Sequence, residues 1–398
     1  MKKPELLAPA GDLERLKIAF MYGADAVYIG GLFNLRANTP NFNLKQLKEG
    51  VEYAHRINKK VYVTLNIALH NKEYEKIKDY LKQLKKINVD AIIISDPSII
   101  HLNKGIGLSL HLSTQASTLN KKAAQYWKDE GIERIVLARE CSKEDIKDIK
   151  ENVDIELETF IHGAMCASYS GRCVLSNYLT NRDSNRGGCS QICRWDFDLY
   201  KGEKPLKGKR PFTFCTKDLS MMKYIPDMID LNIDSFKIEG RMRTIYYIAT
   251  VTKVYRKIID DYCNKNKKYE YNLEYQKILD DVANRDSITQ FFDGNYGKNV
   301  QYYNGRREKT NQDFIGIILD YDTKTHLAKI EQRNYFQKGD YIEIFGPKTS
   351  IKLKINELFD EELNNIEVVR HPRQIVYIKV KEKVKENYMI KCIDKQKK

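Results

Sequence analysis

Short runs of β-branched and aliphatic residues alternate with segments of helical apolar spacing through the first two-thirds of the chain. The eight runs occupy residues 5–10, 26–30, 61–66, 91–95, 108–114, 134–140, 156–162 and 235–240. Between the third and fourth runs, Tyr74, Ile77, Leu81 and Leu84 share one helical face, and Asp12 is placed to cap a helix after the first run. This pattern predicts the α/β class and favours a (β/α)₈ TIM-like barrel over a doubly wound sheet.

The seventh predicted unit is much longer than the others. About 70 residues separate the run that ends at His162 from the run that begins at Ser235, and connections of that length usually carry function. The insertion, residues 163–217, holds five of the eight cysteines, and four of them lie within residues 166–193. We therefore expect residues 1–262 to form a barrel with a cysteine-bearing functional insertion.

The pattern changes after the predicted barrel. Residues 263–310 are polar and charged, and we expect them to form a helical bridge. From residue 311 onward apolar and polar positions alternate, with Lys-Gly-Asp at 338–340 and Gly-Pro at 346–347 as turn signals. Residues 311–398 are therefore predicted to form a small antiparallel β-barrel domain.

Composition excludes several classes of protein. Hydrophobic residues make up 42% of the chain, with only 21 glycines and 9 prolines, which excludes collagen-like and disordered chains. Pro4 and Glu5 interrupt any apolar leader, and no run approaches the ~18 apolar residues of a membrane span. We expect a cytoplasmic protein that does not enter a membrane, in which clustered cysteines indicate metal binding or catalysis rather than disulfides.

The charge balance points to an anionic partner. The chain has 68 Lys and Arg residues against 54 Asp and Glu residues, a formal net charge of +14. Such a charge predicts attraction to polyanions such as RNA, DNA or anionic lipid. A general bias of the composition towards lysine explains the same number, so charge alone leaves both interpretations open.

Four cysteines in the insertion form the most informative motif. They follow the pattern C-x6-C-x15-C-x3-C and are Cys166, Cys173, Cys189 and Cys193. Four thiolates are what a tetrahedral zinc ion or a [4Fe-4S] cluster requires. The spacing leaves zinc and iron–sulfur open, with buried free thiols as the alternative. Cys141 and Cys215 are candidates to replace one of the four, although we favour packed thiols for both.

Longer motifs surround these cysteines. They are E-x-F-I-H-G-A-M-C-x-x-Y-S-G-R-C-x-L-S-N-Y at 158–178, N-R-G-G-C-x-x-x-C-R-W at 185–195, T-K-D-L at 216–219 and F-K-I-E-G-R at 236–241. With these motifs the chain resembles the collagenase-like peptidases of unassigned mechanism, family 32. Within that family it is most similar to the bacterial proteins required for 5-hydroxylation of the tRNA wobble uridine.

The resemblance implies a cofactor and a reaction. The cofactor is a [4Fe-4S] cluster on the four cysteines of the motif, and the reaction is a prephenate-dependent, oxygen-independent hydroxylation of uridine. The older peptidase name of the family implies a competing activity, but the sequence contains neither H-E-x-x-H nor G-x-S-x-G. A Cys166–His162 pair is the remaining peptidase arrangement. A zinc-stabilised RNA-binding protein is the non-enzymatic alternative.

Polar residues close the apolar runs, where a barrel of this type places its reactive groups. The candidate catalytic residues are His162, Glu239 and Lys237. His162 and Glu239 end their runs, and Lys237 lies two residues before Glu239 on the same strand face. An ion pair between these two side chains would orient Glu239 for proton transfer, and a buried pair without chemistry is the alternative.

Further polar and basic residues are candidates to bind the small substrate. A dicarboxylate such as prephenate needs fixed cations, which arginine supplies through two parallel hydrogen bonds. The substrate-binding candidates are Arg36, Asn66, Gln115 and Arg241. Arg243 is a weaker candidate. Asp96 and Glu140 also end their runs, and for Asp96, which precedes Pro97, we favour an explanation without function.

Basic residues are concentrated in and beside the insertion. Residues 171–217 contain ten Lys and Arg residues against four acidic residues. The candidates for contact with a tRNA anticodon loop are Arg182, Arg186, Arg194, Lys207, Lys209 and Arg210. The interleaved aromatic residues Tyr178, Trp195, Phe197 and Tyr200 would stack on unpaired bases. A solvated basic loop over a buried aromatic core is the competing interpretation.

Overall fold

Eight parallel strands close into a barrel in the first of two units, residues 1–308 and 309–398. The computed structural model describes residues 2–35, 41–206, 211–264, 270–294, 297–302 and 313–394. The barrel strands are β1 (Glu5–Ala10), β2 (Ala26–Gly30), β3 (Lys60–Leu65), β4 (Ala91–Ile94), β5 (Leu110–Leu112), β6 (Arg134–Val136), β7 (Glu156–Gly163) and β11 (Ser235–Ile238). Strand β11 pairs in parallel with both β1 and β7, which closes the ring. The predicted (β/α)₈ class is confirmed.

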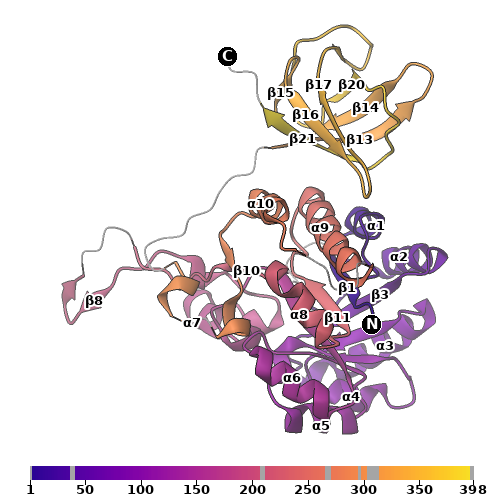
Figure 1. Ribbon diagram of the computed structural model, residues 1–398. Coiled ribbons are helices and arrows are strands. Elements are labelled where there is room, and N and C mark those ends of the chain that lie inside the picture. The colour runs from indigo at the N-terminus through magenta and orange to yellow at the C-terminus, as the bar shows by residue number, and fades with distance from the viewer. Residues whose placement is uncertain are drawn as a thin grey trace. The chain divides into compact units, whose positions relative to one another are not determined.

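Helices alternate with these strands around the barrel (Figure 1). They are α1 (Leu13–Met21), α2 (Leu44–Arg56), α3 (Tyr74–Ile87), α4 (Ser98–Asn103), α5 (Lys121–Asp129), α6 (Lys143–Asn152), α8 (Ile225–Asp230) and α9 (Ile245–Asn264). Asp12 caps α1 as predicted, because its side chain accepts a hydrogen bond from the Arg15 N–H at 2.8 Å. Ile77, Leu81 and Leu84 are buried on one face of α3, so the helical spacing in the sequence does record burial.

The barrel interior is partly apolar and partly ionic. The apolar part includes a cluster of Leu7, Ala26, Tyr28, Tyr62, Ala91 and Ile93. Near the N-terminal ends of the strands, the Arg134 guanidinium pairs with Glu5 at 2.6 Å and with Glu158 at 3.4 Å. These buried charges are tolerated because each has a partner of opposite sign. The filled interior leaves the C-terminal ends of the strands as the place for a site.

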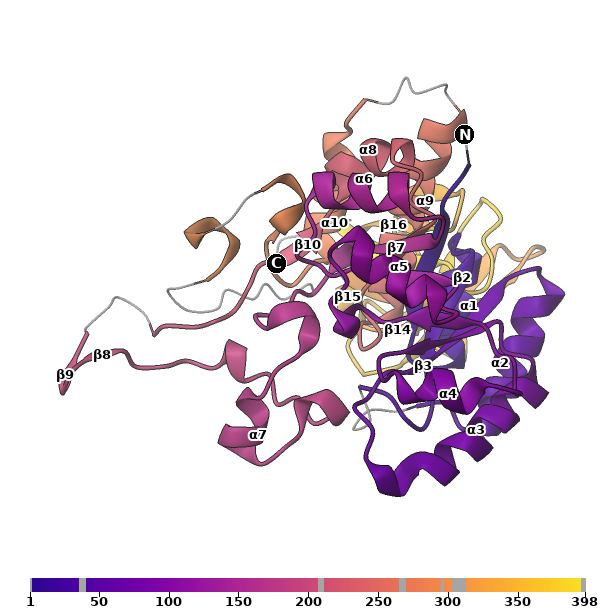
Figure 2. The same cartoon turned by 90° about the horizontal axis from the view of Figure 1, so that it is seen from below.

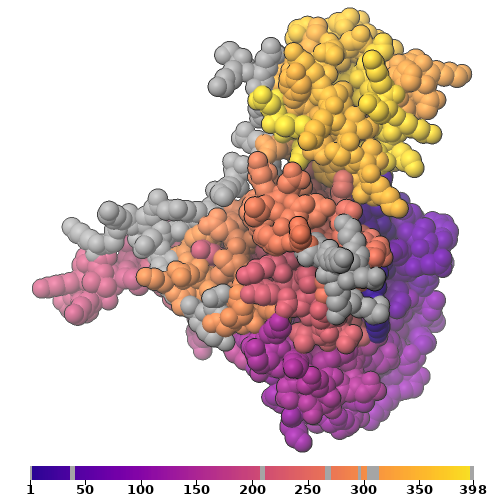
Figure 3. Space-filling model, in the orientation of Figure 1, coloured from indigo at the N-terminus to yellow at the C-terminus, as the bar shows by residue number. Residues whose placement is uncertain are grey.

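The insertion leaves the barrel after β7 and returns next to it. It contains α7 (Leu175–Thr180), the hairpin strands β8 (Tyr200–Lys201) and β9 (Lys204–Pro205), and ends at β10 (Asp218–Ser220). Strand β10 pairs antiparallel with the end of β7 and in parallel with β12 (Ser287–Ile288). The β8–β9 hairpin extends away from the body of the unit (Figures 2 and 3). Both ends of the insertion are thus held by sheet hydrogen bonds.

Helix α10 (Leu273–Val282) packs against α9. Both helices belong to the first unit, which extends to residue 308. Residues 273–282 of the predicted bridge are therefore part of the barrel unit's own packing. Among the described residues, no helix is long and apolar enough to cross a membrane.

The second unit is an antiparallel half-barrel sheet with the strand order β17-β16-β21-β13-β14-β20-β18. Its strands are β13 (Phe314–Asp322), β14 (Leu327–Gln332), β16 (Tyr341–Phe345), β17 (Ser350–Lys354), β18 (Leu358–Phe359), β20 (Ile375–Lys379) and β21 (Met389–Asp394). A separate small pair joins β15 (Phe336–Gln337) to β19 (Val368–Val369). Alternate residues along β14 are buried, as the period-two pattern predicts. The predicted antiparallel β domain is confirmed.

Candidate active site

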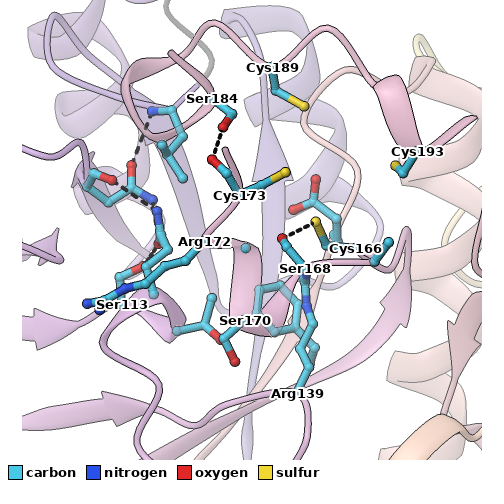
Figure 4. Close-up of a pocket in the computed structure, with 18 of the residues that line it drawn as sticks. Ser113, Arg139, Cys166, Ser168, Ser170, Arg172, Cys173, Ser184, Cys189 and Cys193 are labelled. Carbon is cyan, nitrogen blue, oxygen red and sulfur yellow. Dashed lines mark hydrogen bonds between the residues drawn. The ribbon is translucent and has the colours of Figure 1, made fainter. Parts of the chain in front are cut away.

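A cavity of about 480 Å³ lies at the C-terminal ends of the barrel strands. One side is lined by residues that follow the strands, namely Asn66, Gln115, Arg139, Glu239 and Arg241. The other side is lined by the insertion, and Figure 4 shows both sides. Reactive groups of such barrels gather at this end. The cavity is therefore the candidate active site.

The four cysteines of the motif all line this cavity. They are Cys166, Cys173, Cys189 and Cys193, all free thiols, and in Figure 4 their sulfur atoms face the same space. Burial, with a contribution from the Cys166 thiol, raises the pKa of Cys193 to about 11, so a cation is needed to favour its thiolate. In chemistry the four thiols suit a four-thiolate centre, and all four line one cavity. Within the described ranges, however, no three metal-binding side chains lie close enough to share an ion.

Hydrogen bonds fix the loops that carry these cysteines. The backbone N–H of Cys173 donates to Asn185 Oδ1 at 3.3 Å, and its carbonyl accepts from Asn185 Nδ2 at 2.9 Å. Glu140, at the end of the sixth predicted run, accepts hydrogen bonds from the N–H and the hydroxyl of Ser170. Glu140 therefore ties the start of the insertion to the barrel.

The two alternative cysteines lie outside the cavity lining. Cys141 is buried, and its Sγ lies 3.6 Å from the carbonyl of Thr118. Burial raises the pKa of Cys141 to about 12. Cys215 is buried as well, although its neighbour Phe214 reaches the cavity. These placements agree with packed thiols rather than ligands.

Arg186, a predicted RNA contact, instead holds the insertion to the barrel. Its guanidinium forms two hydrogen bonds with the Glu73 carboxylate, at 2.5 and 2.9 Å, and a third with the carbonyl of Ala68. Hydrogen bonding to Arg186 lowers the pKa of Glu73 to about 2. Because these bonds occupy the guanidinium, Arg186 is a structural anchor.

We predict that Arg186→Gln loosens the insertion in a pH-dependent way. The pKa of Glu73 falls from 4.5 to about 2 on folding, so the pair's contribution is fully present above pH 4.5 and is lost as the pH falls towards 2. Hydrogen exchange of amides 173–190 at about pH 6 should show the variant opening about fivefold more often than wild type. The difference should shrink towards pH 2. Equal exchange in the two proteins at about pH 6 would contradict the anchor, and the exposed Arg182→Gln is the matched control.

Glu239 reaches the cavity directly after β11. Its Oε2 accepts a hydrogen bond from the Tyr28 hydroxyl at 2.9 Å. Burial, with Glu239 next to it, raises the pKa of Tyr28 well above its usual value, so the hydroxyl keeps its proton and donates. Gly163 of β7 allows the close approach, since a Cβ there would lie 2.3 Å from the Glu239 carbonyl oxygen. The predicted placement of Glu239 at the barrel mouth holds.

Lys237 also reaches the cavity, but its ion pair differs from the expected one. The Lys237 ammonium lies 2.7 Å from Glu158 Oε1, with Glu158 completely buried. It also lies 4.7 Å from the ring centroid of Tyr28 and 5.5 Å from that of Phe160. The expected pairing of Lys237 with Glu239 is therefore corrected to a pairing with Glu158. Lys237 contributes a fixed positive charge to the cavity floor.

His162 does not reach the cavity, which corrects its place among the catalytic candidates. Its Nδ1 lies 3.2 Å from the hydroxyl of Tyr255 on α9, and burial lowers its pKa to about 3. The cause is an irregularity in β7, where Lys237 pairs with Phe160 but the next residue, Ile238, pairs with His162. Such a bulge reverses which side of the sheet the following residue faces.

The predicted polar substrate contacts lie in the cavity lining. Asn66 Nδ2 donates to Gln115 Oε1 at 3.3 Å, which forms a pair of amides. Arg241 is buried and donates to Asn34 Oδ1 at 2.7 Å. Gly30 allows this position, because a Cβ there would lie 1.9 Å from the Arg241 guanidinium. Arg36 lies outside the described residues.

The remaining predicted RNA contacts are scattered. Arg182 is exposed. Arg194 is half-buried, and its guanidinium donates to Gln191 at 3.0 Å. Lys207, Lys209 and Arg210 lie outside the described residues. Of the predicted stacking residues, Tyr178, Trp195 and Tyr200 are exposed, Tyr178 to 84%, while Phe197 packs against Phe214.

The lining residues that were not among the predicted site residues include Tyr28, Arg139 and Arg172. Arg139 lies just beyond β6, and Arg172 directly precedes Cys173. Both could have been predicted from the sequence, because Arg139 lies at the end of a predicted strand run and Arg172 lies inside the cysteine motif. Tyr28 lies within β2, where the alternation of a strand buried on both sides gives no sign of which side is inner.

Comparison with known proteins reveals relatives along the whole chain. The profile of peptidase family U32 matches residues 11–302, and that of its C-terminal domain matches residues 310–391. The tRNA hydroxylation protein P1 of Bacillus subtilis is 49% identical, over 98% of this chain and 95% of that protein. A collagenase of Porphyromonas gingivalis is 30% identical over 98% of each chain. The 23S rRNA 5-hydroxycytidine C2501 synthase of Escherichia coli is 39% identical over 64% of this chain and 39% of that protein.

Proposed function

Because the chain belongs to peptidase family U32, in which relatives bear the names of RNA hydroxylation proteins, we propose that it is an RNA-modifying hydroxylase. Its substrate is the wobble uridine of tRNA, hydroxylated at C5 with prephenate as co-substrate. The observation that carries this proposal is the single cavity that joins the polar ends of the barrel strands to four cysteines.

The four motif cysteines would hold a [4Fe-4S] cluster, which four thiolates ligate. When bound, such a cluster supplies one-electron transfer at the wall of the cavity. Free thiols without a competing disulfide are what this cofactor requires. The alternative donor set, with Cys141 or Cys215 replacing a member, is disfavoured because neither lines the cavity.

The charge of the cavity favours an anionic co-substrate. Its described lining contains four cationic side chains, Arg139, Arg172, Lys237 and Arg241, and the carboxylate of Glu239. Because Lys237 is neutralised by Glu158 behind the lining, three cations remain against Glu239. An excess of fixed positive charge in a partly enclosed site attracts and holds carboxylates. Prephenate, with two carboxylates, matches that excess.

The remaining lining groups suit a uracil base. The amides of Asn66 and Gln115 offer donors and acceptors for the imide edge, as single-stranded RNA recognition requires. Hydroxylation breaks the C5–H bond, forms a C5–O bond and releases the C5 hydrogen as a proton, and the co-substrate that supplies the hydroxyl group is then the two-electron acceptor. Glu239 is the carboxylate placed to take the proton, and the Tyr28 hydroxyl bond orients that carboxylate.

Exposed aromatic side chains of the insertion support an RNA loop as the partner. Tyr178, on α7, is 84% exposed, and Leu175 of the same helix lines the cavity. Aromatic rings stack on bases of any identity. A base that enters the cavity would thus leave its neighbours beside Tyr178, with Arg182 available for phosphate.

Peptidase activity is the second candidate, because a relative is named collagenase. Its residues would have to be a Cys166–His162 pair. Cys166 lines the cavity, whereas His162 is buried against Tyr255 and absent from the described lining. The geometry therefore favours the hydroxylase.

The test is mass spectrometry of tRNA nucleosides from a strain that lacks its own tRNA hydroxylation genes and expresses this chain. We expect 5-hydroxyuridine to reappear, and to disappear again when prephenate synthesis is deleted. No 5-hydroxyuridine from a well-expressed protein would refute the substrate assignment. Cleavage of denatured collagen that is lost in Cys166→Ala would favour the peptidase instead.

A further inference from the structure

Arg139 differs from Lys237 and Arg241, the two other cationic side chains that the barrel contributes to the cavity lining. Lys237 is paired with Glu158 and Arg241 is hydrogen-bonded to Asn34. The Nε of Arg139 is buried and has no hydrogen-bond partner. Among the residues that the structure describes, no carboxylate pairs with its guanidinium. A cation that no described carboxylate neutralises is thus held at the cavity wall.

The surroundings of Arg139 leave its hydrogen-bonding edge for a ligand. Its guanidinium carbon lies over the ring of Phe160, 4.1 Å from the ring centroid. The adjacent carboxylate, Glu140, is engaged by Ser170. A guanidinium presents its N–H groups at its edge, where a planar carboxylate accepts two parallel hydrogen bonds.

We propose that Arg139 is the carboxylate-binding residue of the cavity and holds the small anionic co-substrate by its edge. This inference rests on the proposed function for the identity of that co-substrate as prephenate. Phe160 packs against the guanidinium, and the carboxylate of the co-substrate supplies the partner that no described protein carboxylate provides. Arg172, on the insertion side of the same cavity (Figure 4), is the nearest choice for a second carboxylate.

Calorimetric titration of anaerobically prepared full-length protein with prephenate tests this assignment. Arg139→Gln should weaken prephenate binding about 10-fold to 100-fold, the usual loss for a charge-assisted hydrogen bond. Arg139→Lys, which keeps the charge but not the planar edge, should recover part of the affinity. The control Arg56→Gln removes an exposed arginine of α2 and should bind as wild type does. Iron content and thermal unfolding confirm that each variant is folded.

A second titration separates the inference from the function on which it rests. Succinate and its dimethyl ester are used as probes beside prephenate. Wild type should prefer succinate to the ester, and Arg139→Gln should lose that preference. Equal binding of prephenate by wild type and Arg139→Gln would overturn the inference and leave the hydroxylase intact. Arg139-dependent binding of succinate without any binding of prephenate would support the inference and refute prephenate. If no carboxylate binds to wild type, both are wrong.

Discussion

Cys189→Ser is expected to yield a folded protein that has lost its iron and its hydroxylase activity. Of the four motif cysteines, Cys189 is the exposed one, so the substitution removes a ligand with little effect on packing. Anaerobically purified wild type should contain about four iron atoms per chain, and the variant fewer than about one. The formation of 5-hydroxyuridine in tRNA should fall at least 100-fold. Mutation of a residue that only supports a metal ligand already lowers activity by about 10-fold to 100-fold, and Cys189 is proposed as a ligand itself.

Cys263→Ser is the matched control for this result. Cys263 is a half-exposed thiol on α9 and lies outside the cavity lining, so its variant should keep both iron and activity. Full activity in an iron-free Cys189→Ser protein would refute the cluster. Wild type that contains one zinc ion and no iron would instead support the zinc-stabilised RNA-binding alternative.

Glu239→Gln should lower the rate of 5-hydroxyuridine formation by about 100-fold or more. Glu239 supplies the carboxylate among the described residues of the cavity lining, and a positioned general base typically contributes 10²-fold to 10⁴-fold. Glutamine keeps the size and the acceptor oxygen for the Tyr28 hydroxyl but cannot take a proton. Prephenate binding and iron content should therefore stay near the wild-type values while the rate falls.

Two further variants make this result specific. Tyr28→Phe removes the hydrogen bond that orients Glu239, so the rate should fall by less, about tenfold. Glu144→Gln, on the exposed side of α6, should leave the rate unchanged. A Glu239→Gln protein that hydroxylates uridine at the wild-type rate would exclude Glu239 as the base.

The barrel could be predicted because the local spacing of apolar residues indicates which side of each strand or helix is buried. Strand runs and helical faces such as Ile77, Leu81 and Leu84 record which side of each element meets the core. The spacing of four cysteines likewise predicted that they belong to one site, and all four line one cavity. Both inferences depend on residues close together in the chain.

Long-range partners could not be predicted in this way. Alternation placed Lys237 and Glu239 on one strand face, but the partner of Lys237 is Glu158, on a different strand. Which strands become neighbours, and in which register, depends on barrel closure. Arg186 likewise finds Glu73 more than a hundred positions away. For charged side chains, the sequence indicates the chemistry and the fold selects the partner.

His162 shows a different limit. We expected His162 at the barrel mouth because it ends an apolar run, but one extra residue interrupts the pairing of β7 with β11 directly before it. A bulge of this kind costs little and leaves no clear mark on composition. Its effect is decisive, because it moves an imidazole from the cavity to the helix layer.

The way in which the insertion joins the barrel lets the insertion change in evolution while the barrel strands stay in place. The insertion leaves at Gly163 and returns at Leu219, which are register partners in the β7–β10 pairing. Because its two ends lie side by side, its length and sequence can change without displacing a barrel strand. Under the proposed function, the barrel wall can then keep its small-molecule site while the inserted segment is remodelled for another RNA. A chimera that carries the insertion of a relative on this barrel should therefore fold.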